Sequence, residues 1–195
     1  MLNPRATNED LTAKARIRNA AMDLFAQNGA ARVSLRAVAA AAGVTLGLVQ
    51  HHFKTKAGLQ EAVDQLVVDY FATVVASVPA TGTTAEIAAA RDEAVRVMLQ
   101  DNPAVVNYVR RAMLEPAESR IGLLDALIGL TEREVSSLRE AGLASTDRPE
   151  SAQIVSVLVR QLGELLLAPM VDVVWDRMNA PADAAKPHLS IELRY

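Results

Sequence analysis

The apolar positions of this 195-residue chain recur at helical spacing along most of its length. One stripe near the N-terminus predicts a helix that ends at Gly29. A longer stripe begins after Thr55 and predicts a single helix of about twenty residues, Lys56–Val78. The first stripe consists of Ile17, Ala20, Ala21, Leu24 and Phe25. The second consists of Leu59, Val63, Leu66, Val67, Tyr70, Phe71, Val74 and Val75.

Further helices are predicted behind a linker at residues 79–84, which contains proline, glycine and three threonines. The pattern places them at Ala85–Gln100, Pro103–Leu114, Ser119–Ala141, Glu150–Ala168 and from Pro169 or Met170 to Met178. The tail after Asn179 alternates apolar and polar residues near its end, which fits either coil packed on the body or a short edge strand. Residues 1–10 are polar and predict a disordered arm. The fold class is therefore all-α.

Ser34–Leu59 reads as two short helices and the start of a third. Residues 38, 39 and 42 share one helical face, and Gly43 follows where a helix commonly ends in a left-handed conformation. Thr45 is placed to cap the next helix through its hydroxyl. This layout is that of a helix-turn-helix, whose second helix enters the DNA major groove. Its inward face consists of Val49, His52 and Phe53, and its outward face of Leu46, Gly47, Gln50 and His51.

Charge separates the chain at the same place. Residues 1–58 contain eight Lys/Arg and three Asp/Glu, a net charge of +5, whereas residues 59–195 have a net charge of −8. A basic module on an acidic body is typical of a protein that binds a polyanion through one part only. The sequence therefore predicts a DNA-binding domain at 1–58 and a helical regulatory and dimerisation domain at 59–195.

The run AxxAGVTxGxVxHHFKTKxxL, from Ala39 to Leu59, resembles the signature of TetR/AcrR-like transcriptional regulators. The resemblance is detailed over about the first third of the chain, and the rest matches in length and helical character. It implies a three-helix DNA-binding unit joined by a long helix to a C-terminal domain that binds an effector and dimerises. Gln50 stands where the family more often has an aromatic residue, and Leu46 where it often has lysine or another polar residue.

Both the residue chemistry and the resemblance indicate candidate DNA contacts. A glutamine pairs bidentately with adenine, an apolar side chain contacts a thymine methyl group, and hydroxyl groups and cations contact phosphates. Arg16 and Arg18 fit a solvated helix face better. The candidate contacts are Ser34, Arg36, Thr45, Leu46, Gly47, Gln50, His51 and Lys56.

Other classes of function find little support. The chain has no cysteine, so disulfides, thiol nucleophiles and thiolate metal sites are excluded. His51 and His52 are adjacent and point about 100° apart on a helix, which disfavours one shared metal ion. No catalytic motif appears, and we expect neither an enzyme nor a cofactor. No apolar run of the length of a membrane span and no signal peptide are evident, so we expect a cytoplasmic protein that does not bind membranes.

The body offers two further predictions. Residues 154–167 are apolar on nearly two faces, which fits either a core helix or a homodimer interface through Glu150 to Met178. The resemblance favours the dimer and also implies a small apolar or amphipathic effector. Candidate effector contacts are Tyr70, Met98, Asn107, Tyr108, Arg111, Met113, Leu127, Gln161 and Trp175.

The sequence thus predicts a homodimeric regulator, a repressor of a palindromic operator that an effector releases. In this hypothesis the effector tilts Lys56–Val78 and changes the separation of the two recognition helices. A constitutive or partner-controlled DNA-binding protein is the alternative, and a small helical enzyme or carrier with a vestigial N-terminal unit is the third.

Overall fold

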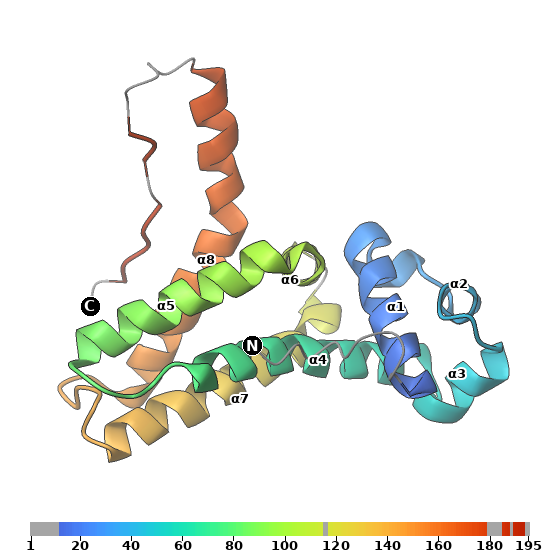
Figure 1. The fold of residues 1–195 in the computed structure, drawn as a ribbon, viewed down its shortest axis with the longest axis horizontal. Coiled ribbons are helices and arrows are strands. Elements are labelled where there is room, and N and C mark those ends of the chain that lie inside the picture. The colour runs from blue at the N-terminus through green and yellow to red at the C-terminus, as the bar shows by residue number, and fades with distance from the viewer. Residues whose placement is uncertain (1–11, 115–116, 179–184, 188, 194–195) are drawn as a thin grey trace. The chain divides into compact units, whose positions relative to one another are not determined.

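The computed structural model describes residues 12–114, 117–178, 185–187 and 189–193 of the chain. Within these residues every regular element is a helix, which confirms the predicted fold class (Figure 1). The chain forms two compact units, Met1–Leu130 and Thr131–Tyr195. The predicted boundary after residue 58 separates a DNA-binding domain from a regulatory one and is not a boundary between compact units. It stays a prediction. The predicted arm at residues 1–10 lies outside the described residues.

The first unit begins with a small helical bundle. Thr12 caps its first helix, because the Thr12 hydroxyl accepts a hydrogen bond from the Ala15 amide at 3.3 Å. Ile17 and Phe25 from the predicted stripe are almost fully buried, together with Val38 from the helix-turn-helix. The elements of this bundle are α1 (Ala13–Asn28), the 3-10 turn η1 (Ala30–Arg32), α2 (Leu35–Ala41) and α3 (Leu46–Phe53).

The long helix α4 (Lys56–Ser77) continues directly from the bundle and matches the predicted element. It contacts α1 and α3 of the bundle and also α5 (Thr84–Asp101). The predicted stripe is buried along its length, from Leu59 through Val74. One helix therefore belongs to two packed regions of the same unit.

A capping box fixes the start of α5. Thr83 accepts from the Glu86 amide, and the Glu86 carboxylate accepts from the Thr83 amide at 2.8 Å. The backbone and hydroxyl hydrogen bonds from Thr83 lower the pKa of Glu86. The chain then breaks at Asn102, as predicted, and α6 (Pro103–Leu114) follows.

A buried polar pair joins α4 to α6. Asp64 and Tyr108 are both buried, and the Tyr108 hydroxyl donates to the Asp64 carboxylate at 2.6 Å. The Tyr108 ring also stacks on Phe25 of α1, with ring centroids 6.5 Å apart. Tyr108 therefore contacts α1 through its ring and α4 through its hydroxyl group.

The second unit contains the end of α7 (Ala117–Glu140), a loop and α8 (Glu150–Arg177). Arg139 organises the loop, since its guanidinium donates to the carbonyl groups of Ser145 at 3.2 Å and Arg148 at 3.0 Å. Ser136 on α7 donates to the Glu150 carboxylate at the start of α8.

The predicted break between Ala168 and Pro169 is wrong, because α8 passes through Pro169 without ending. A proline inside a helix removes one backbone hydrogen bond and costs about 3 kcal/mol. The apolar pattern of the helix continues on both sides of Pro169, and the backbone stays helical from Glu150 to Arg177.

The described residues of the C-terminal tail form no strand. Ile191 lies against α8, where a Cβ atom on Gly163 would be 2.4 Å from the Ile191 Cδ1. Lys186 forms an ion pair with Asp172 on the same helix. Of the two alternatives left open for the tail, the described residues adopt packed coil.

Candidate nucleic-acid interface

The turn between α2 and α3 is a Schellman motif centred on Gly43. Gly43 has φ of 65°, in the left-handed region that favours glycine. Its amide donates to the Ala40 carbonyl at 3.2 Å, and the Val44 amide donates to the Ala39 carbonyl at 3.0 Å. These bonds satisfy two terminal carbonyl groups of α2 and turn the chain directly into α3.

Hydroxyl groups cap both short helices. The Ser34 Oγ accepts from the Ala37 amide at 3.1 Å, and the Thr45 Oγ1 accepts from the Leu48 amide at 3.3 Å. A hydroxyl that accepts such a bond keeps its own proton as a donor. Both exposed residues are therefore compatible with the predicted phosphate contacts.

The two faces of α3 differ sharply in burial. Val49 and Phe53 are buried against the bundle, whereas the outward residues Gly47, Gln50 and His51 are exposed and Leu46 is half-buried. No heavy atom would lie within 4.0 Å of a Cβ on Gly47 except the Thr45 hydroxyl oxygen at that limit. Internal packing does not require a glycine there, so the open surface is available to a ligand.

The sequence prediction overlooked Lys54, which forms the connection from α3 to α4. Its φ of 62° and ψ of −61° describe a γ-turn, a strained geometry for a residue with a side chain. The Thr55 amide closes this turn on the Phe53 carbonyl at 2.7 Å, and the Lys54 ammonium group donates to the His51 carbonyl at 2.9 Å. The cationic KTK turn between two helices was the available signal in the sequence.

Lys56 has a structural partner in addition to its predicted role. Its half-buried ammonium group donates to the Ala31 carbonyl of η1 at 2.9 Å and thereby ties the start of α4 to the bundle. An ammonium group carries three protons, so this bond leaves two donors for a phosphate. Arg36 and Arg32 are exposed on the same bundle and add positive charge.

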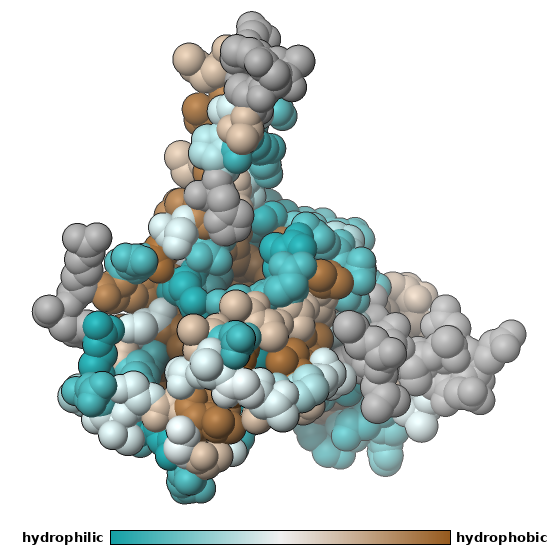
Figure 2. Space-filling view, turned by 60° about the vertical axis from the view of Figure 1, so that its left-hand side comes forward, coloured by the Kyte–Doolittle hydropathy of each residue, from teal (hydrophilic) through white to brown (hydrophobic). Residues whose placement is uncertain are grey.

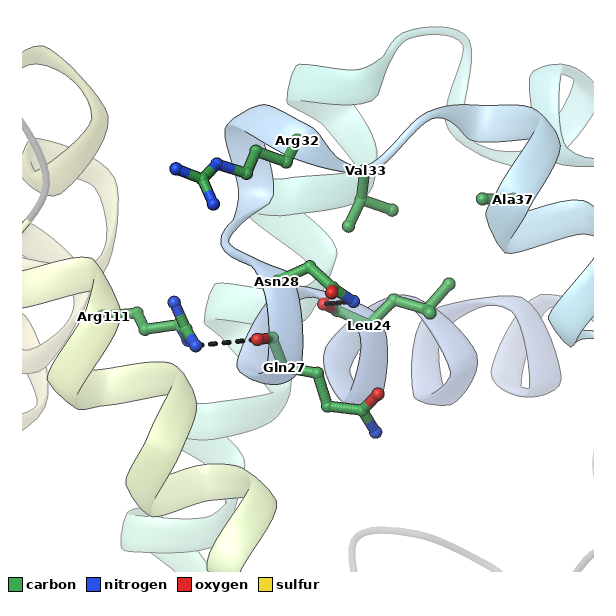
Figure 3. A pocket seen from close by; sticks show the side chains of 7 residues that line it. All are labelled: Leu24, Gln27, Asn28, Arg32, Val33, Ala37 and Arg111. Atoms are coloured by element: carbon green, nitrogen blue, oxygen red, sulfur yellow. Dashed lines mark hydrogen bonds between the residues drawn. The ribbon is translucent and has the colours of Figure 1, made fainter.

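A cleft of about 280 Å³ lies where the end of α1 meets α6 (Figure 3). In this view the Arg111 side chain reaches from α6 to the last turn of α1. Its Nε donates to the Ala26 carbonyl at 2.6 Å and its Nη2 to the Gln27 carbonyl at 2.7 Å. The cleft is lined by Leu24, Gln27, Asn28, Arg32, Val33, Ala37 and Arg111.

The predicted effector contacts are divided between the two units. Gln161 and Trp175 are half-buried on α8 of the second unit, and the others belong to the first. Asn107 is exposed on α6, and Met113 is half-buried on that helix. Core positions of the first unit hold Tyr70, Met98, Tyr108 and Leu127, all of them buried.

One side of α8 is rich in exposed apolar side chains, which Figure 2 shows as brown and tan atoms along this helix. Met170 is 62% exposed and Val174 is 56% exposed. Among the described helices, α8 is also the one that is long and apolar enough to cross a membrane. Core helices of soluble proteins can have the same length and composition. The exposed members of this face are Val155, Val159, Leu167, Met170, Val173, Val174 and Met178.

Comparison with known proteins finds a family match in the N-terminal part of the chain. Residues 17–63 match the family model for bacterial regulatory proteins of the tetR family. The chain is 53% identical over 60 residues to the HTH-type transcriptional regulatory protein RaaS of Mycobacterium tuberculosis strain H37Rv. These 60 residues make up 31% of this chain. This match spans only 28% of the length of RaaS.

Solved structures extend the likeness in fold to most of the chain. A candidate tetR family transcription regulator from Shewanella sp. PV-4 superposes with a TM-score of 0.69 at 22% identity, covering 86% of this chain and 88% of that one. The fatty acid degradation regulator FadR from Bacillus halodurans gives a TM-score of 0.67 at 15% identity, covering 88% and 89%. Residues 17–63 therefore match the tetR family model, and most of the chain shares the fold of these solved structures.

Proposed function

We propose that this protein is a DNA-binding transcriptional regulator that acts as a homodimer on a palindromic operator. The observation that carries the proposal is the outward face of α3, where Gly47, Gln50 and His51 are exposed. A recognition helix presented in this way enters the major groove, and two copies read half-sites one helical turn or its multiples apart.

The exposed groups divide into two kinds of contact. Gln50 reads an adenine edge and Leu46 contacts a thymine methyl group, which supplies sequence preference. Ser34 and Thr45 donate their hydroxyl protons to phosphates. Cations at residues 36, 54 and 56 supply the salt-dependent part of the affinity.

The exposed face of α8 supports dimerisation. At 100° per residue, positions 155, 159, 167, 170, 174 and 178 fall within one sector of about 140°. The acidic residues Glu164, Asp172 and Asp176 fall on the other side of the helix, whereas Arg160 lies at the edge of the sector and Arg177 lies within it, in the last turn. A membrane-spanning helix would bury the three carboxylates in lipid at considerable cost, whereas a dimer covers the apolar sector and leaves them in water. A second copy of the chain is therefore the partner that fits α8, and the protein is cytoplasmic.

The regulatory step of the proposal is repression relieved by a small apolar or amphipathic effector in the body. In this proposal the effector acts by tilting α4, since α4 contacts both the bundle and α5. The alternative without an effector draws on the burial of Tyr108 and Met98, which pack as ordinary core. Scanning a library of apolar acids and amines for release of the operator decides between the two.

Selection of bound duplexes from a random DNA pool tests the DNA-binding proposal. The expected result is an inverted repeat, bound by a complex that sedimentation velocity measures as a dimer or a pair of dimers. Gln50→Ala protein should select a different consensus from the same pool. Recovery of unrelated sequences by wild-type and variant protein alike, at moderate salt, would contradict base reading by α3.

A further inference from the structure

Arg111 completes the C-terminal cap of α1 from a helix more than eighty residues away in the chain. The last turn of a helix leaves carbonyl groups without partners inside the helix. In α1 the Phe25 carbonyl accepts from the Gly29 amide at 2.8 Å, and those of Ala26 and Gln27 accept from Arg111. No residue in the last turn of α1 itself is basic.

The chemistry of this contact makes it directional. A guanidinium group is planar and presents its N–H groups in a fixed fork, so two bonds to successive carbonyls define an orientation as well as a distance. Positive charge is also favoured at a helix C-terminus by the helix dipole. Apolar packing between two helices tolerates small sliding movements, but this pair of bonds does not.

The same side of α6 also carries Tyr108, three residues before Arg111. Tyr108 stacks on Phe25 of α1 and donates to Asp64 of α4. Arg111 holds the end of α1, and α1 contacts both α2 and α3. The helix-turn-helix therefore rests on a helix whose C-terminal end is held by α6.

We infer that Arg111 is a positioning residue for DNA binding, which fixes the helix-turn-helix bundle on α6 through the carbonyl groups of Ala26 and Gln27. This inference rests on the proposed function, because it concerns the presentation of α3 to DNA. It gives Arg111 a role different from the effector contact predicted from the sequence. Without the two bonds, the bundle samples a wider range of orientations, and only part of the population presents α3 correctly.

Arg111→Gln removes the charge and the fork, and Arg111→Lys keeps the charge but offers a single point of attachment. Arg96→Gln is the matched control, because it removes one positive charge from an exposed position on α5. The absence of cysteine in the chain permits spin labels at two introduced cysteines, Ala40→Cys on α2 and Ala89→Cys on α5, both at exposed positions. Diluting labelled into unlabelled protein restricts the measurement to distances within one chain.

The expected result is a broadened distance distribution in Arg111→Gln, a smaller broadening in Arg111→Lys and none in Arg96→Gln. Operator affinity of Arg111→Gln, measured by fluorescence anisotropy with the selected duplex, should fall about threefold to tenfold, because the competent fraction falls by that factor. The slope of affinity against salt should stay unchanged, since a positioning residue releases no counterions.

An unchanged distance distribution or an unchanged affinity in Arg111→Gln would overturn the inference. A salt slope reduced by about one would also overturn it, because Arg111 would then be a phosphate contact. The distance measurement needs no DNA. If wild-type protein bound no duplex, the proposed function would fail. The distances between the two spin labels would still decide whether Arg111 holds the bundle on α6.

Discussion

Gly58→Ala should loosen the junction between the helix-turn-helix and α4. A Cβ atom at position 58 would lie 2.5 Å from the Phe53 carbonyl oxygen and 3.6 Å from the Thr55 hydroxyl oxygen. The Phe53 oxygen has little freedom to move, because it accepts the Thr55 amide at 2.7 Å in the γ-turn at Lys54. Relief of the contact requires a shift of roughly 0.5–1 Å between α3 and the first turn of α4.

The magnitude follows from two opposing effects. Forcing an extra methyl group into a packed site costs about 1–3 kcal/mol. Replacing glycine by alanine in a helix recovers up to about 1 kcal/mol, and less in the first turn, where Gly58 lies. The net loss of stability is about 1–2 kcal/mol, which lowers the Tm of a chain of this size by about 2–8 °C.

Thermal unfolding followed by circular dichroism measures the loss, and anisotropy with the selected duplex measures the accompanying fall in affinity. Gly47→Ala is the matched control, because its Cβ would meet nothing closer than 4.0 Å. It should gain up to about 1 kcal/mol of stability, while its methyl group on the outward face of α3 weakens DNA binding. A Gly58→Ala protein that melts at or above the wild-type temperature would refute the reasoning.

Three other substitutions have defined outcomes. Gln50→Ala should cost about 1–3 kcal/mol on the selected site and little on a site altered at one base pair, as competition binding would reveal. Val174→Asp should weaken the dimer by about 2–4 kcal/mol, whereas Ala168→Asp on the charged side of α8 should leave the sedimentation coefficient unchanged. Tyr108→Phe should lower the free energy of unfolding by about 1–3 kcal/mol in urea titrations, because the Asp64 carboxylate stays buried and loses a hydrogen-bond donor. Equal urea midpoints for variant and wild-type protein would argue against the hydrogen bond from Tyr108 to Asp64.

Features that depend on neighbouring residues were accessible from the sequence. The hydroxyl caps at Ser34 and Thr45, the glycine turn at Gly43 and the start of α4 after Thr55 each involve contacts only three to five residues apart. The outward face of α3 follows from helical spacing alone. Pro169 misled the prediction because a proline removes one backbone hydrogen bond, whereas a 28-residue helix keeps its other backbone hydrogen bonds on both sides.

The cations of the N-terminal region show why the remainder was not accessible. Their net charge is a sum over residues and indicates an anionic partner, but it does not reveal which of them also bond within the protein. Lys56 donates to a carbonyl of η1 and Lys54 to one of α3, while Arg111, counted with the acidic body, caps α1. Every residue has the same backbone carbonyl group, so the sequence does not indicate which carbonyl groups accept these hydrogen bonds. These bonds lie where α1, α3 and α4 end or begin, and they therefore set the geometry on which the proposed recognition by α3 depends.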